Sequence, residues 1–419
     1  PYTNRYVLQP SVDSIREFRI LTNNYSAEYG RSAGAQMNIV TRSGSNAFHG
    51  AAYEYLRNRK LDARNFFEGS DALKYVRNQF GGSLGGPIRH DKAFFFANYE
   101  TLRERRGIVK LFAAPSAAQR IGDLSASPTP VIDPFTQRPF PNNQIPANRI
   151  HPIARRIIDL FPQQNANLQP VQREDNHNFV TRTDVSLGSR DLLTLRYGWT
   201  SQDLVEPFIE STNIPNFGNI VANTGHNIAL QHQRVWSPNT IQTTRFAFTR
   251  SFRQALQQNY TTNVGALWGV DWLNVQPRDY GYPSVRVAGF SQVGDLDQTP
   301  IQRSTDTYQV HEQVLLERGA HSLRAGGEFR KLAMDGFLDY YSRGSLTFSG
   351  ALTGSGMADL LLGLPSFAIQ SQFDNRQSLR TTAYNLFLQD TWRVTHKLNL
   401  SLGVRYEFNR PPVDPEDRM

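Results

Sequence analysis

The sequence predicts an all-β protein whose strands form an antiparallel transmembrane β-barrel, preceded by a short α+β segment. Three observations predict this class. From Asn46 onward, apolar and aromatic residues alternate with polar ones, as in strands that have one apolar and one polar face. No stretch approaches the roughly 18 apolar residues of a membrane helix. Aromatic residues make up 11% of the chain, with 26 Phe and 17 Tyr, which favours strands that meet lipid on one side.

Composition excludes several other classes. With 419 residues the chain is long enough for one large or two ordinary domains. The absence of cysteine excludes disulfide frameworks, thiolate metal sites and cysteine nucleophiles. A mean hydropathy of −0.50 is typical of soluble proteins, but barrels share it because only every second residue of a strand faces lipid. The 45 basic residues outnumber the 37 acidic ones but are scattered, so we expect no nucleic-acid partner.

The first 45 residues are predicted to be α+β. Ser11 to Ile20 begins with a helix N-cap candidate and a short helical turn, then continues as a strand. Gln36 to Thr41 is a second short β-type run. The glycines Gly30, Gly34 and Gly44 stand where the chain turns tightly or another backbone approaches. The chain starts and ends in mid-pattern, which predicts an internal fragment of a longer protein.

After Asn46 the chain repeats a unit of two strands, a tight turn and a longer polar connection. The clearest strand is Leu398 to Phe408, which places alternate apolar residues on one face and Arg405 and Glu407 on the other. Eleven such residues, at about 3.3 Å each and tilted by about 40°, span a roughly 25 Å apolar band. Further predicted strands are 384–394, 178–187 with 192–201, 227–236 with 241–252, and 307–317 with 322–332.

The glycine-rich stretch Gln79 to Pro87 superficially resembles a phosphate-binding loop. No helix follows it, and the next element, Lys92 to Glu100, is another strand, so the required βαβ context is missing. We interpret these glycines as places of strong curvature or of close packing against the N-terminal segment.

Three stretches resemble one known family. They are Tyr25 to Gly50 (Y-S-A-E-Y-G-R, then N-I-V-T-R-S-G and F-H-G), G-G-S-L-G-G-P-I with F-F-F-A-N-Y-E, and Gln389 to Glu407. The family is the TonB-dependent outer-membrane transporters, in particular the Oar-like branch. The resemblance implies that residues 1–45 are the C-terminal part of a plug domain. Residues 46–419 would then be the N-terminal part of the barrel, with about 13 of some 22 strands, and the TonB box would lie upstream.

Long and short connections alternate, and this assigns the two ends of the barrel. The plug lies at the periplasmic mouth in the resembled family, so the tight turns are expected in the periplasm and the connections 107–175, 202–224 and 253–302 outside. To keep this parity, we expect Ser345 to Ser349 to descend, Met357 to Gly363 to form a short helix at the periplasmic rim, and Ser366 to Phe373 to ascend.

The sequence predicts no catalytic, cofactor or metal site, and no enzyme. The nine His show no H-E-x-x-H motif, and no Ser or Thr lies in a nucleophile-elbow pattern. Asp295 and Asp297 lack the rest of a calcium loop.

Six charged residues are candidates for a contact between plug and wall: Glu28, Arg31 and Arg42 on the plug, and Glu54, Arg405 and Glu407 on the wall. In one interpretation the plug residues are solvated surface charges. In the other, which the resemblance implies, they form a latch that holds the plug until an energy-coupling partner pulls on it. In the same way, Arg103, Arg105 and Arg106 are either plain rim charges or contacts for lipopolysaccharide phosphates.

These observations lead us to expect a receptor or transporter in the outer membrane of a Gram-negative bacterium, which imports a nutrient by plug displacement. The expected partners are the TonB complex, through an upstream region, outer-membrane lipid, lipopolysaccharide and the ligand; siderophore, oligosaccharide and peptide remain open. The alternative is a structural or adhesive barrel that binds a surface or glycan without transport. A secreted soluble β-sandwich is disfavoured because its apolar strand faces would stay exposed.

Overall fold

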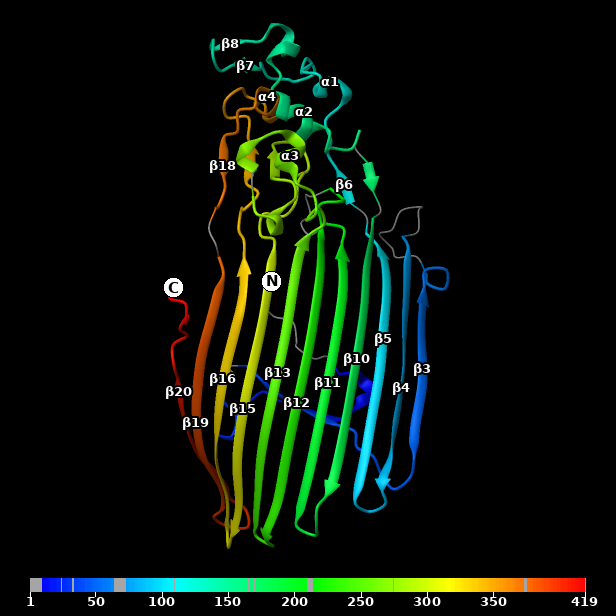
Figure 1. Ribbon diagram of the computed structural model, residues 1–419, viewed down its shortest axis with the longest axis vertical. Helices are drawn as coiled ribbons and strands as arrows, with labels where there is room; N and C mark the ends of the chain where they lie inside the picture. The colour runs from blue at the N-terminus through cyan, green and yellow to red at the C-terminus, as the bar shows by residue number, and fades with distance from the viewer. Residues whose placement is uncertain are drawn as a thin grey trace.

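The computed structural model describes residues 10–23, 25–31, 34–63, 73–108, 110–163, 166–168, 170–208, 214–273, 275–372 and 375–418. Its main feature is a curved sheet of eleven long strands (Figure 1). Each strand pairs antiparallel with its neighbours. The two edge strands do not pair with each other in the described part of the chain, so the barrel is not closed.

The strands of this sheet follow one another in chain order. They are β3 (His49–Asn58), β4 (Tyr75–Arg89), β5 (Ala93–Gly107), β10 (Val171–Ser186), β11 (Asp191–Glu206), β12 (Asn219–Ser237), β13 (Thr240–Gln257), β15 (Ile301–Arg318), β16 (His321–Leu338), β19 (Gln377–Arg393) and β20 (Asn399–Asn409). Most are longer than predicted. The 18 residues of β13, at about 3.3 Å each and a tilt of about 40°, rise about 45 Å, well beyond an apolar band of about 25 Å. Alternating hydrophobicity marked only the part of each strand that faces lipid.

The predicted alternation is confirmed on both faces of the sheet. Leu230, Phe246, Val310 and Phe329 lie directly opposite one another on four neighbouring strands, and so share the outer face. Phe246 is 51% exposed. On β20 the outer face carries exposed apolar residues, whereas Ser401 on the inner face accepts a hydrogen bond from Gln389 Nε2 at 3.0 Å. The outer face is therefore the one suited to lipid.

Aromatic rings form a belt on the outer face. Tyr99, His177 and Trp199 stack across β5, β10 and β11, with ring centroids 6.3 and 6.4 Å apart. The Tyr99 hydroxyl lies 2.8 Å from His177 Nδ1. Amphipathic rings in this arrangement are typical of the girdles at membrane interfaces.

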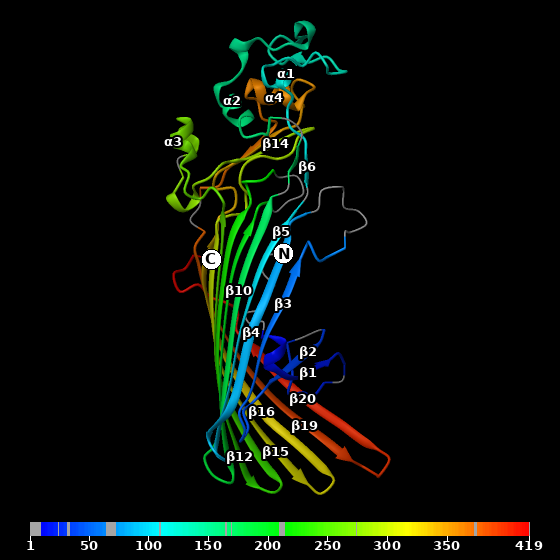
Figure 2. The ribbon, with the colours of Figure 1, turned by 90° about the vertical axis from the view of Figure 1, so that its right-hand side faces the viewer.

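The N-terminal segment lies on the concave side of the sheet (Figure 2). It contains the 3₁₀ helix η1 (Val12–Ser14) and the antiparallel strands β1 (Ile15–Leu21) and β2 (Gln36–Thr41), so the predicted turn and strands are confirmed. The predicted boundary at residues 45 and 46 falls between β2 and β3.

The long connections fold together into one unit above the sheet, which we call the cap: the described residues of 108–170, 207–218, 258–300 and 339–376 (Figure 1). Its elements are β6 (Lys110–Phe112), α1 (Ala117–Arg120), β7 (Ile132–Asp133), β8 (Arg138–Pro139), η2 (Pro141–Asn143), η3 (Ala147–Arg149), α2 (Pro152–Ile158), β9 (Ala166–Leu168), α3 (Val264–Trp268), η4 (Asp271–Leu273), η5 (Pro277–Asp279), β14 (Ser284–Val287), β17 (Ser345–Phe348), α4 (Gly356–Leu362) and β18 (Phe367–Ile369). In the described ranges, no helix is long and apolar enough to cross a membrane.

The cap has its own hydrophobic core, to which all four connections contribute. Phe112, Phe217, Val285 and Leu360 are each buried in it and come from different connections. The sequence predicted these connections only as polar links on the outer side, and their shared apolar core was not predicted. Burial of apolar side chains from distant segments makes them one folded body.

Three predictions about residues 342–380 are wrong. Residues 345–348 form β17 in a small cap sheet with β14 and β18 and do not descend in the wall. The predicted helix is α4, but all seven of its residues are buried in the cap, not at the periplasmic rim. The apolar helix requires a core, and the outer connections supply one. The main sheet consequently has eleven strands where about 13 were predicted. Residues 367–369 of the strand predicted to ascend from Ser366 to Phe373 form β18 in the same cap sheet, and the predicted end at Phe373 lies outside the described residues.

The assignment of the two ends of the sheet is unchanged by this correction. One of the two strands removed from the wall was expected to descend and the other to ascend, so the direction of every later strand stays the same. The turns β4–β5, β10–β11, β12–β13, β15–β16 and β19–β20 are short and lie at the end opposite the cap (Figure 1).

A cysteine-labelling experiment tests this orientation. The chain has no natural cysteine, so Gln137→Cys in the β7–β8 turn and Asn239→Cys in the β12–β13 turn each provide a single thiol. In intact cells, a bulky polyethylene-glycol maleimide that does not cross the outer membrane is expected to label the first variant only. After the outer membrane is permeabilised, both should react. Labelling of residue 239 alone in intact cells would reverse the assignment.

Candidate functional site

The N-terminal segment is anchored to the wall at one side of the sheet by polar contacts. Ser11 Oγ donates a hydrogen bond of 2.6 Å to Asn98 Oδ1 on β5, and both residues are buried. Arg182 on β10 donates from Nη1 to the Thr41 carbonyl at 3.0 Å. A buried polar pair of this kind is costly to break on one side only, so these contacts fix the position of η1 and the end of β2.

A second contact joins residues 25–31 to the opposite part of the sheet, β19 and β20. Arg405 Nη1 donates to the backbone carbonyls of Ala27 and Glu28, at 3.3 and 3.0 Å. Gln389 Oε1 accepts from the Ala27 N–H at 3.0 Å. Arg405 also donates from Nε to Glu407 Oε1 at 2.6 Å, and its side chain is only 13% exposed. We call Arg405, Glu407 and Gln389, with the segment 25–31, the plug contact, after the plug that the sequence predicts for residues 1–45.

Four of the six predicted charged residues lie together at this contact. Arg405 and Glu407 face inward, as predicted, and Glu28 is held through its backbone carbonyl while its carboxylate lies 3.9 Å from Arg324 Nη1. Arg31 adopts a left-handed backbone conformation with φ 62°, which is uncommon for a residue other than glycine. It forms no direct hydrogen bond or ion pair with any residue that the structure describes.

The electrostatic surroundings of Arg31 nevertheless include the wall. Partial desolvation and then repulsion from Arg330 lower the pKa of the Arg31 guanidinium, while Glu328 and Glu407 act in the opposite direction. Its side chain remains exposed. Arg31 thus senses the wall charges through space, and Arg405 makes the direct contact.

The other two predicted residues lie elsewhere. Arg42 donates from Nε to the Ile15 carbonyl at 3.3 Å, a bond within the N-terminal segment. Glu54 lies on the outer face of β3, directly opposite Phe80, whereas its neighbour Tyr53 points inward and donates to Glu100 Oε2 at 2.9 Å. The expectation that Glu54 faces the lumen is therefore wrong, because Tyr53 takes that face.

The three predicted glycines differ in what surrounds them. A Cβ on Gly30 would overlap the Arg405 and Glu407 side chains. A Cβ on Gly44 would overlap backbone, namely the Phe95 carbonyl, and would lie 2.6 Å from the Gly86 carbonyl. Gly34 has nothing within 4 Å of that position. The predicted close packing of the glycine-rich strand β4 against this segment is thus confirmed at Gly44.

Sequence reasoning missed four residues of these contacts: Ser11, Asn98, Arg182 and Gln389. Inward-facing polar residues were available from the alternation of each strand. Which of them meets the N-terminal segment depends on the placement of strands far apart in the chain.

Among the described residues, no group of three or more His, Cys, Asp or Glu side chains is arranged so that it could hold a metal ion. Asp295 and Asp297 are buried and are bonded to protein groups: Asp295 accepts from Asn259 and the Tyr282 N–H, and Asp297 from Arg286.

The outer end of β3 to β5 carries a basic hollow of about 540 Å³. Arg57, Arg59, Lys74 and Arg106 line it, with Asp62 as the acidic residue. Of the other predicted rim charges, Arg105 forms a two-point ion pair with Asp175 at 2.8 and 2.9 Å, and Arg103 is exposed.

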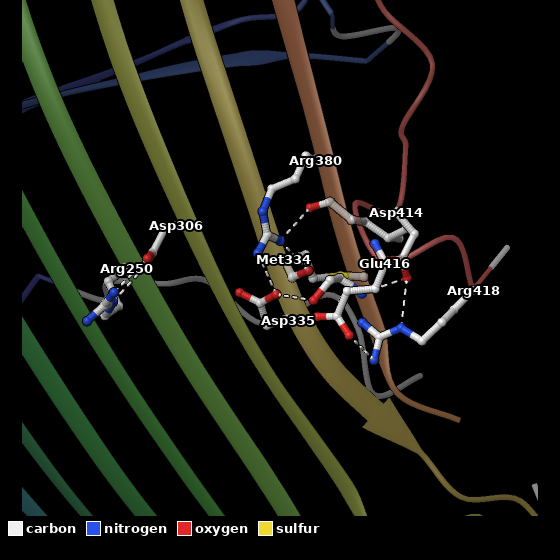
Figure 3. Close-up of polar contacts among 10 residues, drawn as sticks. Arg250, Asp306, Met334, Asp335, Arg380, Asp414, Glu416 and Arg418 are labelled. Carbon is white, nitrogen blue, oxygen red and sulfur yellow. Dashed lines mark hydrogen bonds and ion pairs between the residues drawn. The ribbon is translucent and has the colours of Figure 1, made fainter. Parts of the chain in front are cut away.

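A band of ion pairs marks the outer face near the cap end of β13 to β19 (Figure 3). Arg250 bonds Asp306 at 2.6 and 2.7 Å, and Arg380 bonds Asp335 at 2.7 Å. Beyond β20, Arg418 pairs with Asp414 and Glu416, and Asp414 also accepts from the Ser378 N–H. This band faces outward beyond the apolar rows, at a level suited to lipid headgroups.

Known proteins similar to this chain include a family of barrel domains, one transporter and several solved structures. The family described as outer membrane beta barrel domain matches residues 40–419. The TonB-dependent transporter Oar of Myxococcus xanthus is 37% identical over 97 residues, which cover 21% of this chain and 9% of that protein. Among solved structures, the outer membrane transporter YddB from Escherichia coli has a TM-score of 0.55 at 12% identity, covering 96% of this chain and 44% of that one.

The siderophore receptor PirA from Acinetobacter baumannii is similar to the same degree, with a TM-score of 0.52 at 12% identity over 94% of this chain and 44% of that one. At such identities the likeness concerns the fold. The chain spans less than half the length of these relatives.

Proposed function

The chain belongs to the family of outer membrane beta barrel domains, and on that premise we propose that it is part of a TonB-dependent transporter that imports a nutrient when its plug is displaced. The location that follows from the family is the outer membrane of a Gram-negative bacterium. The relatives found are transporters and receptors, not enzymes.

The plug contact is the observation that carries this proposal. Three hydrogen bonds hold the backbone of residues 27 and 28. Arg405 donates two of them to carbonyl groups, and Gln389 accepts the third from the Ala27 N–H. Each is expected to contribute about 0.5 to 3 kcal/mol, the higher values applying to the charged donor. A contact of a few hydrogen bonds holds the plug segment in place at equilibrium and can be broken when a partner protein pulls on the plug. Gln36 Nε2 donates to the Gly30 carbonyl at 3.0 Å, so movement of β2 would be passed to this segment.

Replacement of Arg405 tests this role. Arg405→Met removes both bonds to the plug backbone and leaves Glu407 without its cation, so the plug should loosen. We expect a clear rise in the entry of a large hydrophilic antibiotic that intact outer membranes exclude. Arg31→Ala should have a smaller effect in the same direction, because Arg31 acts only through space.

The matched control is Arg380→Met, which removes an inter-strand guanidinium on the outer face that does not touch the plug. It should leave antibiotic entry unchanged. Inserted, folded Arg405→Met protein with wild-type antibiotic entry would refute the latch. If Arg31→Ala alone has no effect, Arg31 is a solvated surface charge.

The cap supports a second candidate function, adhesion to a surface or glycan without transport. Its β7–β8 turn presents Phe135, which is 72% exposed, beneath the Arg149 guanidinium at 5.4 Å. Loss of TonB distinguishes the two functions: ligand uptake would stop, whereas cell adhesion would persist.

We propose the remaining partners on chemical grounds. The outward ion-pair band, together with Arg103, is suited to the phosphates of lipopolysaccharide, and the basic hollow is suited to an anionic group on a ligand. The family relationship supports TonB as the energy-coupling partner.

A further inference from the structure

The base of the cap contains a group of charges, most of them buried, that no step of the proposed transport uses. We call it the cap-base cluster: Arg278, Asp279, Arg286, Asp295, Asp297, Asp339 and Arg343. It joins two outer connections, since five of these residues precede β15 and two follow β16. With four carboxylates and three guanidiniums, the cluster has one excess negative charge when every group is ionised.

Arg343 occupies the centre of the cluster and is 2% exposed. Its guanidinium donates mainly to neutral acceptors, namely the Leu296 carbonyl at 2.5 Å and Thr299 Oγ1 at 3.0 Å. Asp295 is fully buried and accepts from Asn259 Nδ2 at 2.8 Å and from the Tyr282 N–H at 2.7 Å. Arg343 therefore compensates the carboxylates by its charge without saturating their oxygens.

Arg278 is the cation that lies close to both Asp279 and Asp339. Arg278 Nε lies 3.0 Å from Asp339 Oδ2 and 3.9 Å from Asp279 Oδ2. In each carboxylate the other oxygen, Oδ1, is buried and has no hydrogen-bond donor among the described residues. Both carboxylates are buried, each has an oxygen without a donor, and both lie near the same cation. This arrangement favours one proton shared between the two carboxyl groups. That proton would also cancel the excess charge of the cluster.

We propose that the cap-base cluster is a proton-linked clamp: uptake of a proton between Asp279 and Asp339 tightens the cap, and its release loosens it. The shared proton would satisfy both Oδ1 atoms and remove the repulsion between the two connections. This clamp does not depend on what the barrel transports.

The direction of the pH dependence follows from the carboxyl groups. Burial, with repulsion from Asp279, raises the pKa of Asp339 to about 6, and burial raises the pKa of Asp295 to about 6. A folded-state pKa above the unfolded value of about 3.9 means that the folded cap binds more protons. Its extra stability is complete below about pH 4 and is lost as pH rises through about 6. Arg278, Arg286, Arg343, Asp297 and the Tyr282 phenol are the other ionisable groups facing these carboxyls.

Hydrogen exchange on the intact protein in detergent tests the clamp. Protection factors, corrected for intrinsic exchange rates, would be measured for peptides covering 278–300 and 339–346 at about pH 5 and about pH 7.5. In the wild type, protection is expected to fall by about tenfold or more between about pH 5 and about pH 7.5. About tenfold is the fall expected from one carboxyl whose pKa is raised to about 6.

Asp339→Asn places an amide donor where the shared proton would lie. At about pH 7.5 this variant should show clearly more protection than the wild type at the same pH, and it should keep only the part of the pH dependence that is due to Asp295. Asp279→Asn should behave alike and serves if the first variant folds poorly. Asp133→Asn, at the ion pair with Arg149 in the tip of the cap, is the control and should keep the wild-type dependence at the base. An unchanged dependence in both cluster variants, or protection that rises with pH in the wild type, would overturn the proposal.

Discussion

Phe246→Arg is expected to destabilise the barrel by about 2 to 4 kcal/mol, the cost of a cation on the lipid face near mid-membrane. Phe246 is 51% exposed on the outer face of β13, between Leu230 on β12 and Val310 on β15. Apolar neighbours on both sides leave an arginine there without a counter-charge. Denaturant titration of the intact protein, refolded into lipid vesicles, measures the effect.

Ala247→Arg is the matched control, because it adds the same side chain one residue away on the inner face. There Ala247 lies between Ala229 and Gln309, on the polar side of the sheet. Its change in unfolding free energy should be well below that of Phe246→Arg. Equal costs for the two variants would show that these faces do not separate lipid from lumen.

Gly44→Ala is expected to cost about 1 to 3 kcal/mol, the usual price of forcing extra atoms into a well-packed place. The added methyl group would meet the carbonyls of Phe95 and Gly86, which belong to paired strands and are not free to move aside. The link between β2 and β3 would then be pushed away from the wall. We expect a lower thermal midpoint and weaker protection of residues 36–45 from protease.

Gly34→Ala makes the same chemical change where nothing lies within 4 Å of the new atom. Its thermal midpoint should stay within the error of the wild-type value. If both variants behave like the wild type, the close approach at Gly44 does not hold the N-terminal segment in place.

The wall of the barrel was the most predictable part of the molecule. Alternation along Leu398 to Phe408 identified a strand and both its faces, because successive side chains of a strand point to opposite sides. The tight turns could be placed for the same local reason, since short polar links between two such runs permit only adjacent antiparallel strands.

The site was predictable only in part. Arg405 and Glu407 were correctly placed on the inner face from alternation. Gly30 was predicted at a tight turn or a close backbone approach, whereas the groups that lie close to it are the Arg405 and Glu407 side chains. Glu54 was misplaced because the alternation in β3 is ambiguous: both Tyr53 and Glu54 are able to face the lumen, and the hydrogen bond from Tyr53 to Glu100 decides between them.

The sequence by itself determined where most wall strands lie, which face is apolar in most of them and which neighbours are joined by tight turns, since these follow from a repeat of two residues and from short links. Only the tertiary structure decided that four outer connections share one core, that α4 lies in it, and that the described part of the wall has eleven strands. It also decided that Arg405 and Gln389 hold residues 27 and 28, more than 350 positions away. Such contacts depend on how distant segments meet in space, and no local pattern of residues encodes which surfaces will pack together.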